Sequence, residues 1–313
     1  AIENPDKNYL VIVPEQFTMQ TQKDLCLAHP KGGIMNIDVL SFGRLAYRVF
    51  EEVGQDARVV LDDEGKNLVL RKIAGECEKD LKVFKGNLKK QGYISEVKSV
   101  LSEFAQYGVD FERLDDFMKE VPPESYLHYK LDDIRTIYEK FEEYLSEKYI
   151  TKEEMLDVLS DAVPYSDILK GSVVAMDGFT GFTPVQNRLI GELFSVCEKV
   201  MITVTMDGRE NPYVYEHPYQ IFALGKQMVT SLMKIAGEKK TEIEEPICLF
   251  ERPVYRFRDC SEMAFLETEL FRYSGAKYNG SCESVSLHEV RSPGKEAKYV
   301  AESIRRLVRT KGY

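Results

Sequence analysis

The stretch DGFTGFTPVQ, residues 177–186, begins with an acid directly after the apolar run SVVAM. Many ATPases hold a magnesium ion with a carboxylate placed at the end of a buried strand. Asp177 has that place, but Gly178 follows it where a hydrolysing site carries a second acid that polarises the attacking water. The stretch is therefore an ATP-hydrolysing site, a site that has lost this chemistry, or a loop that binds something else.

Other parts of an ATP-driven motor are missing from the sequence. No G-x-x-x-x-G-K-[ST] loop is present, so the chain lacks the backbone cradle that holds phosphates. A single carboxylate is a weak magnesium site, and no arginine can be singled out as a catalytic finger. We therefore expect no catalytic residue, no metal site and no ATP hydrolysis from this chain.

The elements that must position this stretch are typical of a layered α/β fold. Four apolar runs without strict alternation predict parallel strands covered on both faces: Tyr9–Pro14, Ile37–Phe42, Ser172–Asp177 and Lys199–Thr205. Amphipathic stretches between them predict helices, as in RecA-like or Rossmann-like folds. The carboxyl ends of parallel strands share one edge, so we expect the loops after these strands to converge there.

Between the second and third runs the sequence is helical throughout, with apolar residues at i, i+3 or i+4 and i+7. We predict a RecA-like core in residues 1–60 and 160–282 and an inserted helical subdomain in residues 61–159. A strand at 285–290 followed by a helix at 294–309 predicts that residues 283–313 begin a second α/β domain. The chain starts with Ala1, and we expect it to be part of a longer protein.

Composition limits the class of protein. The 313 residues can form two compact units, and 42 basic against 52 acidic residues give a formal charge of −10. This balance argues against a basic nucleic-acid coat, although it permits a local channel. The six cysteines form no C-x-x-C pair, which is typical of reduced thiols in a cytoplasmic protein. No apolar run approaches the roughly 20 residues of a membrane span.

A family resemblance rests on three segments: VPEQFTMQTQ (13–22), SFGRLAYRVFEE (41–52) and MDGFTGFTPVQ (176–186). The third is similar to the D-E-F-Q-D-T-N-P-x-Q motif of superfamily 1 helicases, matching at Asp177, Phe179, Pro184 and Gln186. Together the segments resemble the AddB (RexB) family, the B subunits of bacterial AddAB helicase–nucleases. Asp177 and Gln186 are then remnants of a degenerate Walker B-like motif.

The resemblance implies a superfamily 1 helicase core whose motor is degenerate. It implies AddA (RexA) as partner, double-stranded DNA ends as substrate for resection in recombinational repair, and scanning of the passing single strand for the Chi sequence. The family also uses ATP, magnesium and a 4Fe–4S cluster. Its phosphate-binding loop and its nuclease domain are expected outside this chain.

The resemblance also implies which residues read DNA: Gln16, Thr18, Phe42, Arg44, Tyr47 and Phe182, with Phe179 as second choice for the last. The family often has Trp where this chain has Tyr47. Bases of a single strand need flat rings for stacking, amide and hydroxyl groups for their edges, and arginine for guanine or phosphate. These residue types therefore suit the implied task.

Structural roles remain open for the same residues. Phe42 and Phe179 could pack in the core, Thr18 could cap a helix, and Arg44 and Arg48 could pair with Glu51 and Glu52. Two other functions also remain open. The longer protein could be an active ATPase or helicase, or the chain could be a structural scaffold for AddA.

Overall fold

The computed structural model describes every residue except 55–57, 89, 147 and 251–254. The chain divides into two compact units, residues 1–244 and 245–313, and each is described by itself. Parallel strands and many helices build the first unit, which belongs to the α/β class predicted from the sequence.

The centre of the first unit is a four-stranded parallel sheet with the order β2-β1-β5-β6. Its strands are β1 (Tyr9–Ile12), β2 (Ile37–Leu40), β5 (Val173–Met176) and β6 (Lys199–Ile202). All four predicted strands are present, and each is shorter than predicted. In β1 the ladder stops after the Val13 N–H donates to the Leu40 carbonyl, because Pro14 has no N–H to continue it.

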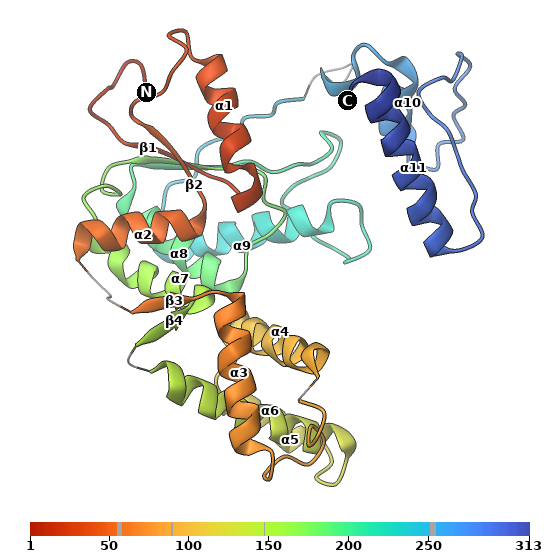
Figure 1. The fold of residues 1–313 in the computed structure, drawn as a ribbon. Helices are drawn as coiled ribbons and strands as arrows, with labels where there is room; N and C mark the ends of the chain where they lie inside the picture. Colours follow the sequence, from red (N-terminus) through yellow and green to blue (C-terminus); the bar gives the residue numbers. More distant parts are fainter. Residues whose placement is uncertain (55–57, 89, 147, 251–254) are drawn as a thin grey trace. The chain divides into compact units, whose positions relative to one another are not determined.

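The chain runs from β1 outward to β2, then returns past β1 to β5 and β6. Right-handed crossovers therefore place the first helix on one side of the sheet and the later ones on the other, as Figure 1 shows. These helices are α1 (Thr18–Ala28), which follows the 3₁₀ turn η1 (Glu15–Phe17), and then α2 (Phe42–Val53), α7 (Lys152–Ala162), α8 (Pro184–Val196) and α9 (Ala223–Lys239).

One face of the sheet is much better buried than the other. Leu10, Ile12, Val174 and Met176 form the main core with residues of α2, α7 and α8. The alternate positions of β1 and β5 are only half-buried. The sheet was predicted to be covered on both faces, and the cover is thinner on the α1 side, because α1 buries only its first residue.

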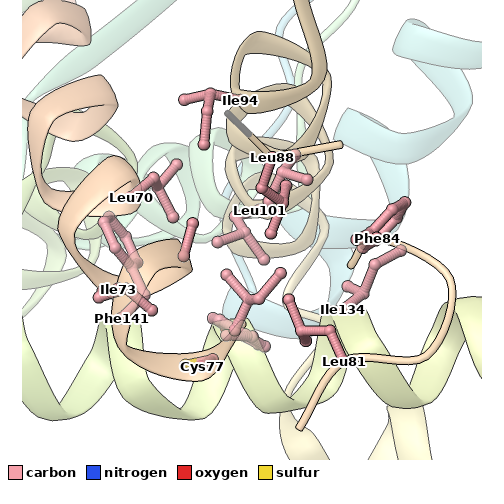
Figure 2. Packing of buried hydrophobic residues seen from close by; sticks show 14 of the residues in the cluster. Leu70, Ile73, Cys77, Leu81, Phe84, Leu88, Ile94, Leu101, Ile134 and Phe141 are labelled. Atoms are coloured by element: carbon pink, nitrogen blue, oxygen red, sulfur yellow. The ribbon is translucent and has the colours of Figure 1, made fainter. Parts of the chain in front are cut away.

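The helical region, defined here as residues 63–145, has a hydrophobic core of its own. It contains α3 (Asp63–Cys77), α4 (Gln91–Tyr107), α5 (Phe111–Glu120) and α6 (Tyr126–Leu145). Figure 2 shows Leu70 and Ile73 of α3, Leu101 of α4, and Ile134 and Phe141 of α6 converging on this core. The short parallel strands β3 (Val59–Leu61) and β4 (Tyr149–Thr151) pair where the chain enters and leaves the region.

Helix α7 packs differently from the sequence interpretation, which grouped it with the helices before it. Met155, Leu159 and Ala162 of α7 lie in the core beneath the four-stranded sheet, and so does Ile150 of β4. The 3₁₀ turn η2 (Val163–Tyr165) then leads toward β5. A helical period reveals that a helix has an apolar face but not which core receives that face.

The second unit contains η3 (Tyr255–Phe257), α10 (Ser261–Glu269) and α11 (Pro293–Lys311). The strand predicted at 285–290 was wrong, since these residues form no strand. A strand needs a neighbour for its hydrogen bonds, and no described residue of this unit supplies one.

Among the described helices, none combines the length and apolarity needed to cross a bilayer.

Candidate functional site at the carboxyl edge of the sheet

The loops after β1 and β5 meet at the point where the chain reverses its direction across the sheet. Ligands of open α/β sheets bind at this kind of switch point. Here the two loops touch, since a Cβ added to Gly178 would lie 3.5 Å from Pro14 Cδ and 3.9 Å from Phe17 Cδ2. The crevice above β1 and β5 is therefore covered by packed chain rather than left open.

Gly178 occupies a backbone conformation that suits glycine, with φ at +80°. Any L side chain is strained there, and a glutamate at this position would have to change the backbone. A carboxylate cannot be held here to polarise a water molecule without rearrangement of the loop.

Asp177 lies exposed at the end of β5, where its Oδ1 accepts a 2.5 Å hydrogen bond from the Thr203 hydroxyl. This bond joins the loop after β5 to the loop after β6. Within the described part of the chain, no group of three or more His, Cys, Asp or Glu side chains is arranged to hold a metal ion. Asp177 therefore acts in this structure as a link between two loops.

Three phenylalanine rings, one from the start of α2 and two from the loop after β5, pack together at this edge. The ring centroids of Phe42 and Phe179 are 5.4 Å apart, those of Phe42 and Phe182 are 6.3 Å apart, and those of Phe179 and Phe182 are 5.1 Å apart. Phe42 is only 7% exposed and belongs to the main core, against which Phe179 and Phe182 pack half-buried. The three rings therefore belong to the packed side of this edge, against the main core.

Gln186 has a structural role at the start of α8. Its side-chain oxygen accepts from the Thr183 N–H at 2.9 Å, while Thr183 Oγ1 accepts from the Gln186 N–H at 3.3 Å, which completes a capping box. The T-x-x-Q spacing in the sequence is a signal for this box, and the sequence interpretation missed it. The box fixes the end of the loop that carries Phe182.

The segment after β1 presents Gln16 to solvent but hides Thr18. The Thr18 side chain is buried, and its hydroxyl donates to the Glu15 carbonyl at 3.0 Å. The residue at the N-cap of α1 is Phe17, not Thr18, so the capping role considered for Thr18 was wrong. Phe17 is exposed beside Gln16, and the sequence interpretation did not include it.

Helix α2 presents Arg44 and Tyr47 on its exposed side, one turn apart. Arg44 Nε lies 3.4 Å from Glu15 Oε1, which brings the loops after β1 and β2 together, and Arg48 pairs with Asp38. Among the contacts of the described residues, neither of these arginines pairs with Glu51 or Glu52. Tyr47 is 56% exposed, and its ring is open to a ligand.

The candidate site thus has an exposed layer over a packed one. The solvent-facing side chains come from η1 and from α2: Gln16, Phe17, Arg44 and Tyr47. Flat rings, an amide and a guanidinium can stack on and hydrogen-bond to bases or other planar polar ligands. The predicted residues Thr18, Phe42, Phe179, Phe182 and Gln186 lie below or beside this layer and fix its shape.

Curated relatives share the whole length of this chain. It is 40% identical over all of its length to the B subunit of the ATP-dependent helicase/deoxyribonuclease of Lachnoclostridium phytofermentans, of which it covers 28%. The proteins of the same name from Thermoanaerobacter sp. strain X514 and Clostridium acetobutylicum are 35% and 32% identical over 96% and 97% of the chain, and 26% of each is covered. The chain therefore spans about a quarter of the length of these relatives.

A family model described as "ADDB, N-terminal" matches residues 1–267. That match includes both hydrophobic cores and every loop of the candidate site. This chain belongs to the ADDB N-terminal family.

Proposed function

We propose that this chain is the helicase-like, motor-degenerate part of the B subunit of an ATP-dependent helicase–exonuclease that resects double-strand DNA breaks. Its sheet edge scans the passing single strand for Chi. The observation that supports this proposal is the layered site, in which Gln16, Arg44 and Tyr47 face solvent over packed phenylalanines, while Gly178 has the backbone conformation of a glycine.

The proposal treats the sheet as a RecA-like core. Its support is the parallel order β2-β1-β5-β6 with a change of direction between β1 and β5, and an acid at the end of β5. In motors of this class the acid after this strand serves the nucleotide. Here Asp177 bonds to Thr203 and Gly178 replaces the second acid, so the edge is released for another ligand.

Each exposed side chain has a distinct task in the proposed scanning. The Tyr47 ring stacks on a base, a contact worth about 1–3 kcal/mol. Arg44 donates to guanine or to a phosphate, and the Gln16 amide contacts a base edge. Phe42, Phe179 and Phe182 contribute by holding these groups in place rather than by stacking on DNA over a full ring face.

The remaining partners and cofactors belong to the longer protein. The relatives are named as ATP-dependent and as B subunits. We propose AddA (RexA) as the partner, with ATP, magnesium and a 4Fe–4S cluster held by parts of the complex outside this chain. Residues 1–313 contribute recognition of DNA and no catalytic step.

The test uses the complete two-subunit complex, with Arg44→Ala or Tyr47→Ala introduced into this chain. The Chi response is measured as the fraction of DNA ends on which degradation stops at Chi, and unwinding is measured on Chi-free DNA. We expect the Chi response to fall at least about tenfold, since each side chain supplies one base contact. The unwinding rate should stay unchanged.

Arg48→Ala is the matched control, because Arg48 lies on the same helix and pairs with Asp38 on the surface. It should respond to Chi like the unmodified complex. A normal Chi response in both the Arg44 and Tyr47 variants would contradict the proposal. ATP turnover by the longer protein without its partner would favour the active-motor alternative. A site covered by the partner, with no crosslink to DNA, would favour the scaffold alternative.

A further inference from the structure

A long loop follows β6 at the same edge of the sheet as the candidate site. Residues 203–222 connect β6 to α9, which exceeds the roughly 12–15 residues beyond which an irregular connection in a compact domain is usually functional. The loop starts at Thr203, whose hydroxyl donates to Asp177 in the loop after β5. It is therefore continuous with the candidate site.

Polar contacts within the loop and to α9 hold this loop in place. Lys226 of α9 is buried and its Nζ lies 2.7 Å from Glu210 Oε2. The Gln220 side-chain oxygen accepts from the backbone N–H groups of Glu216 and His217 at 3.4 and 3.3 Å. These contacts tie Glu210 to α9 and the Gln220 side chain to the backbone of residues 216 and 217, which lowers the cost of ordering this part of the loop when a ligand binds.

Despite this anchoring, the loop leaves its aromatic rings in solvent. Tyr219 is 80% exposed, and its ring lies parallel to that of His217, with centroids 4.9 Å apart and an interplanar angle of 10°. Tyr213 and Tyr215 are exposed as well. One face of the Tyr219 ring is covered by His217, and the high exposure shows that the opposite face is open to a second ring.

The charges of the loop are largely engaged inside it. Asp207 and Arg209 form a pair with Nη2 and Oδ2 2.6 Å apart, and Glu216 accepts from Gln220. Together with the Glu210–Lys226 pair, this leaves the loop without an excess of positive charge. A ligand would bind here through ring stacking rather than through its phosphates.

We propose that the loop of residues 203–222 is a second contact for single-stranded DNA, where nucleobases stack on Tyr219 and the neighbouring tyrosines regardless of sequence. This inference rests on the proposed function, because it extends the strand path from the Arg44–Tyr47 face across the ends of β5 and β6. Arg44 and Tyr47 distinguish DNA sequences, whereas the loop of residues 203–222, called here the tyrosine loop, binds single strands of any sequence.

The test uses the complete two-subunit complex with Tyr219→Ala, in a chelating buffer without magnesium or ATP so that DNA stays intact. Equilibrium binding is measured with fluorescent single strands with and without Chi, over a series of salt concentrations. We expect binding of both strands to weaken by at least about fivefold, as the loss of one stacked base predicts. The slope of log affinity against log salt should stay the same, because no phosphate contact is removed.

Two variants accompany this one. Tyr219→Phe keeps the ring and should bind like the unmodified complex. Tyr165→Ala removes a ring that is 69% exposed on η2, which precedes β5 and lies toward the amino ends of the strands, and it should also bind normally. Unchanged binding by Tyr219→Ala, a loss confined to the Chi strand, or a changed salt slope would overturn the inference.

The outcome is separable from that of the proposed function. If Tyr219→Ala binds normally while Arg44→Ala loses its Chi response, the tyrosine loop is not a DNA contact and the scanning proposal stands. If Tyr219→Ala binds DNA weakly while Arg44→Ala responds normally to Chi, the tyrosine loop contacts DNA but the residues that recognise Chi lie elsewhere. A Tyr219 position that crosslinks to the partner protein rather than to DNA also counts against the inference.

Discussion

Among the described residues of the helical region, the charged side chains of Lys66 and Asp133 are buried, whereas the charged side chains at the carboxyl edge of the four-stranded sheet lie on the surface. Asp133 of α6 is 1% exposed and accepts the backbone N–H groups of residues 82, 83 and 84. Lys66 of α3 is equally hidden and contacts Ser102 of α4 and Glu153 of α7. Gln16, Arg44 and Tyr47 at the sheet edge instead face solvent.

The difference separates two uses of polar residues in one fold. A buried charge costs free energy unless it is fully bonded, so its partners must be part of the structure. An exposed polar group has little effect on stability and stays available to a ligand. Stability measurements can therefore distinguish structural from ligand-facing residues without any DNA present.

Lys66 should show the largest effect. Lys66→Ala leaves the Glu153 carboxylate, 12% exposed, without the ammonium group 2.6 Å away. Removal of one member of a buried pair lowers stability by about 3–5 kcal/mol, which urea unfolding of this chain would measure. Lys119→Ala, which breaks an exposed pair with Asp116 in the same region, should leave the free energy of unfolding nearly unchanged. Equal losses in the two variants would contradict the comparison.

Phe42 and Tyr47 sharpen the comparison within the candidate site. Phe42→Ala removes a buried ring from the main core and should lower the free energy of unfolding by about 3–4 kcal/mol. Tyr47→Ala removes an exposed ring from the same helix and should change it by less than about 0.5 kcal/mol. Thermal denaturation of both variants tests this. A stable Phe42→Ala variant would show that Phe42 is not part of the core.

Asp133→Ala should lower the free energy of unfolding by about 2–3 kcal/mol, because it leaves three backbone N–H groups without their acceptor. The neighbouring Asp132→Ala breaks only a surface contact with Lys82 and serves as the control. Hydrogen exchange at residues 82–84 would locate the effect. Persistent protection of these amides in Asp133→Ala would mean that the carboxylate does not hold this turn.

Much of the fold could be predicted from the sequence. The parallel strands were visible because buried strands are continuously apolar, and the helices showed their period directly. The core that receives α7 could not be predicted, because Met155 and Leu159 would suit either core. The absence of a strand at 285–290 could not be predicted either, since alternation indicates a strand but does not supply its partner.

That the loops of the candidate site share one edge could be predicted, but the exposure of their side chains could not. Strand ends located the edge, and the resemblance selected loops that do meet there. Burial then separated residues of the same type, since Phe42 lies in the core and Phe17 is exposed, although both are phenylalanines just after strands. The exposure of Tyr219 could not be predicted, because one sequence does not show which tyrosines face water.

Where α6 of the helical region lies near α7 of the sheet core, one carboxyl group, that of Glu142, has a raised pKa. Burial raises the pKa of Glu142 from its ordinary 4.5 to about 7, and the nearby Glu154 carboxylate adds to this. Glu154 accepts the Thr151 N–H at 2.7 Å and so caps α7. Glu142 on α6 therefore keeps a proton at a pH where an exposed glutamate is ionised.

Glu142 gives the smallest predicted effect, on the pH dependence of stability. Between pH 4.5 and about 7 the folded chain holds a proton that the unfolded chain has released, so stability falls as pH rises through this window. Glu142→Gln should remove this slope and make the chain about 1–2 kcal/mol more stable than the unmodified chain at pH 8, after allowance for solvent screening of a half-buried group. Below pH 4.5 the stabilities of the two chains should be equal.

Urea unfolding across pH 4.5–8 measures the pH dependence of stability in both chains. Glu143→Gln changes an exposed neighbour and should keep the pH dependence of the unmodified chain. If stability changed with pH equally in Glu142→Gln and in the unmodified chain, Glu142 would not be the group that holds the proton.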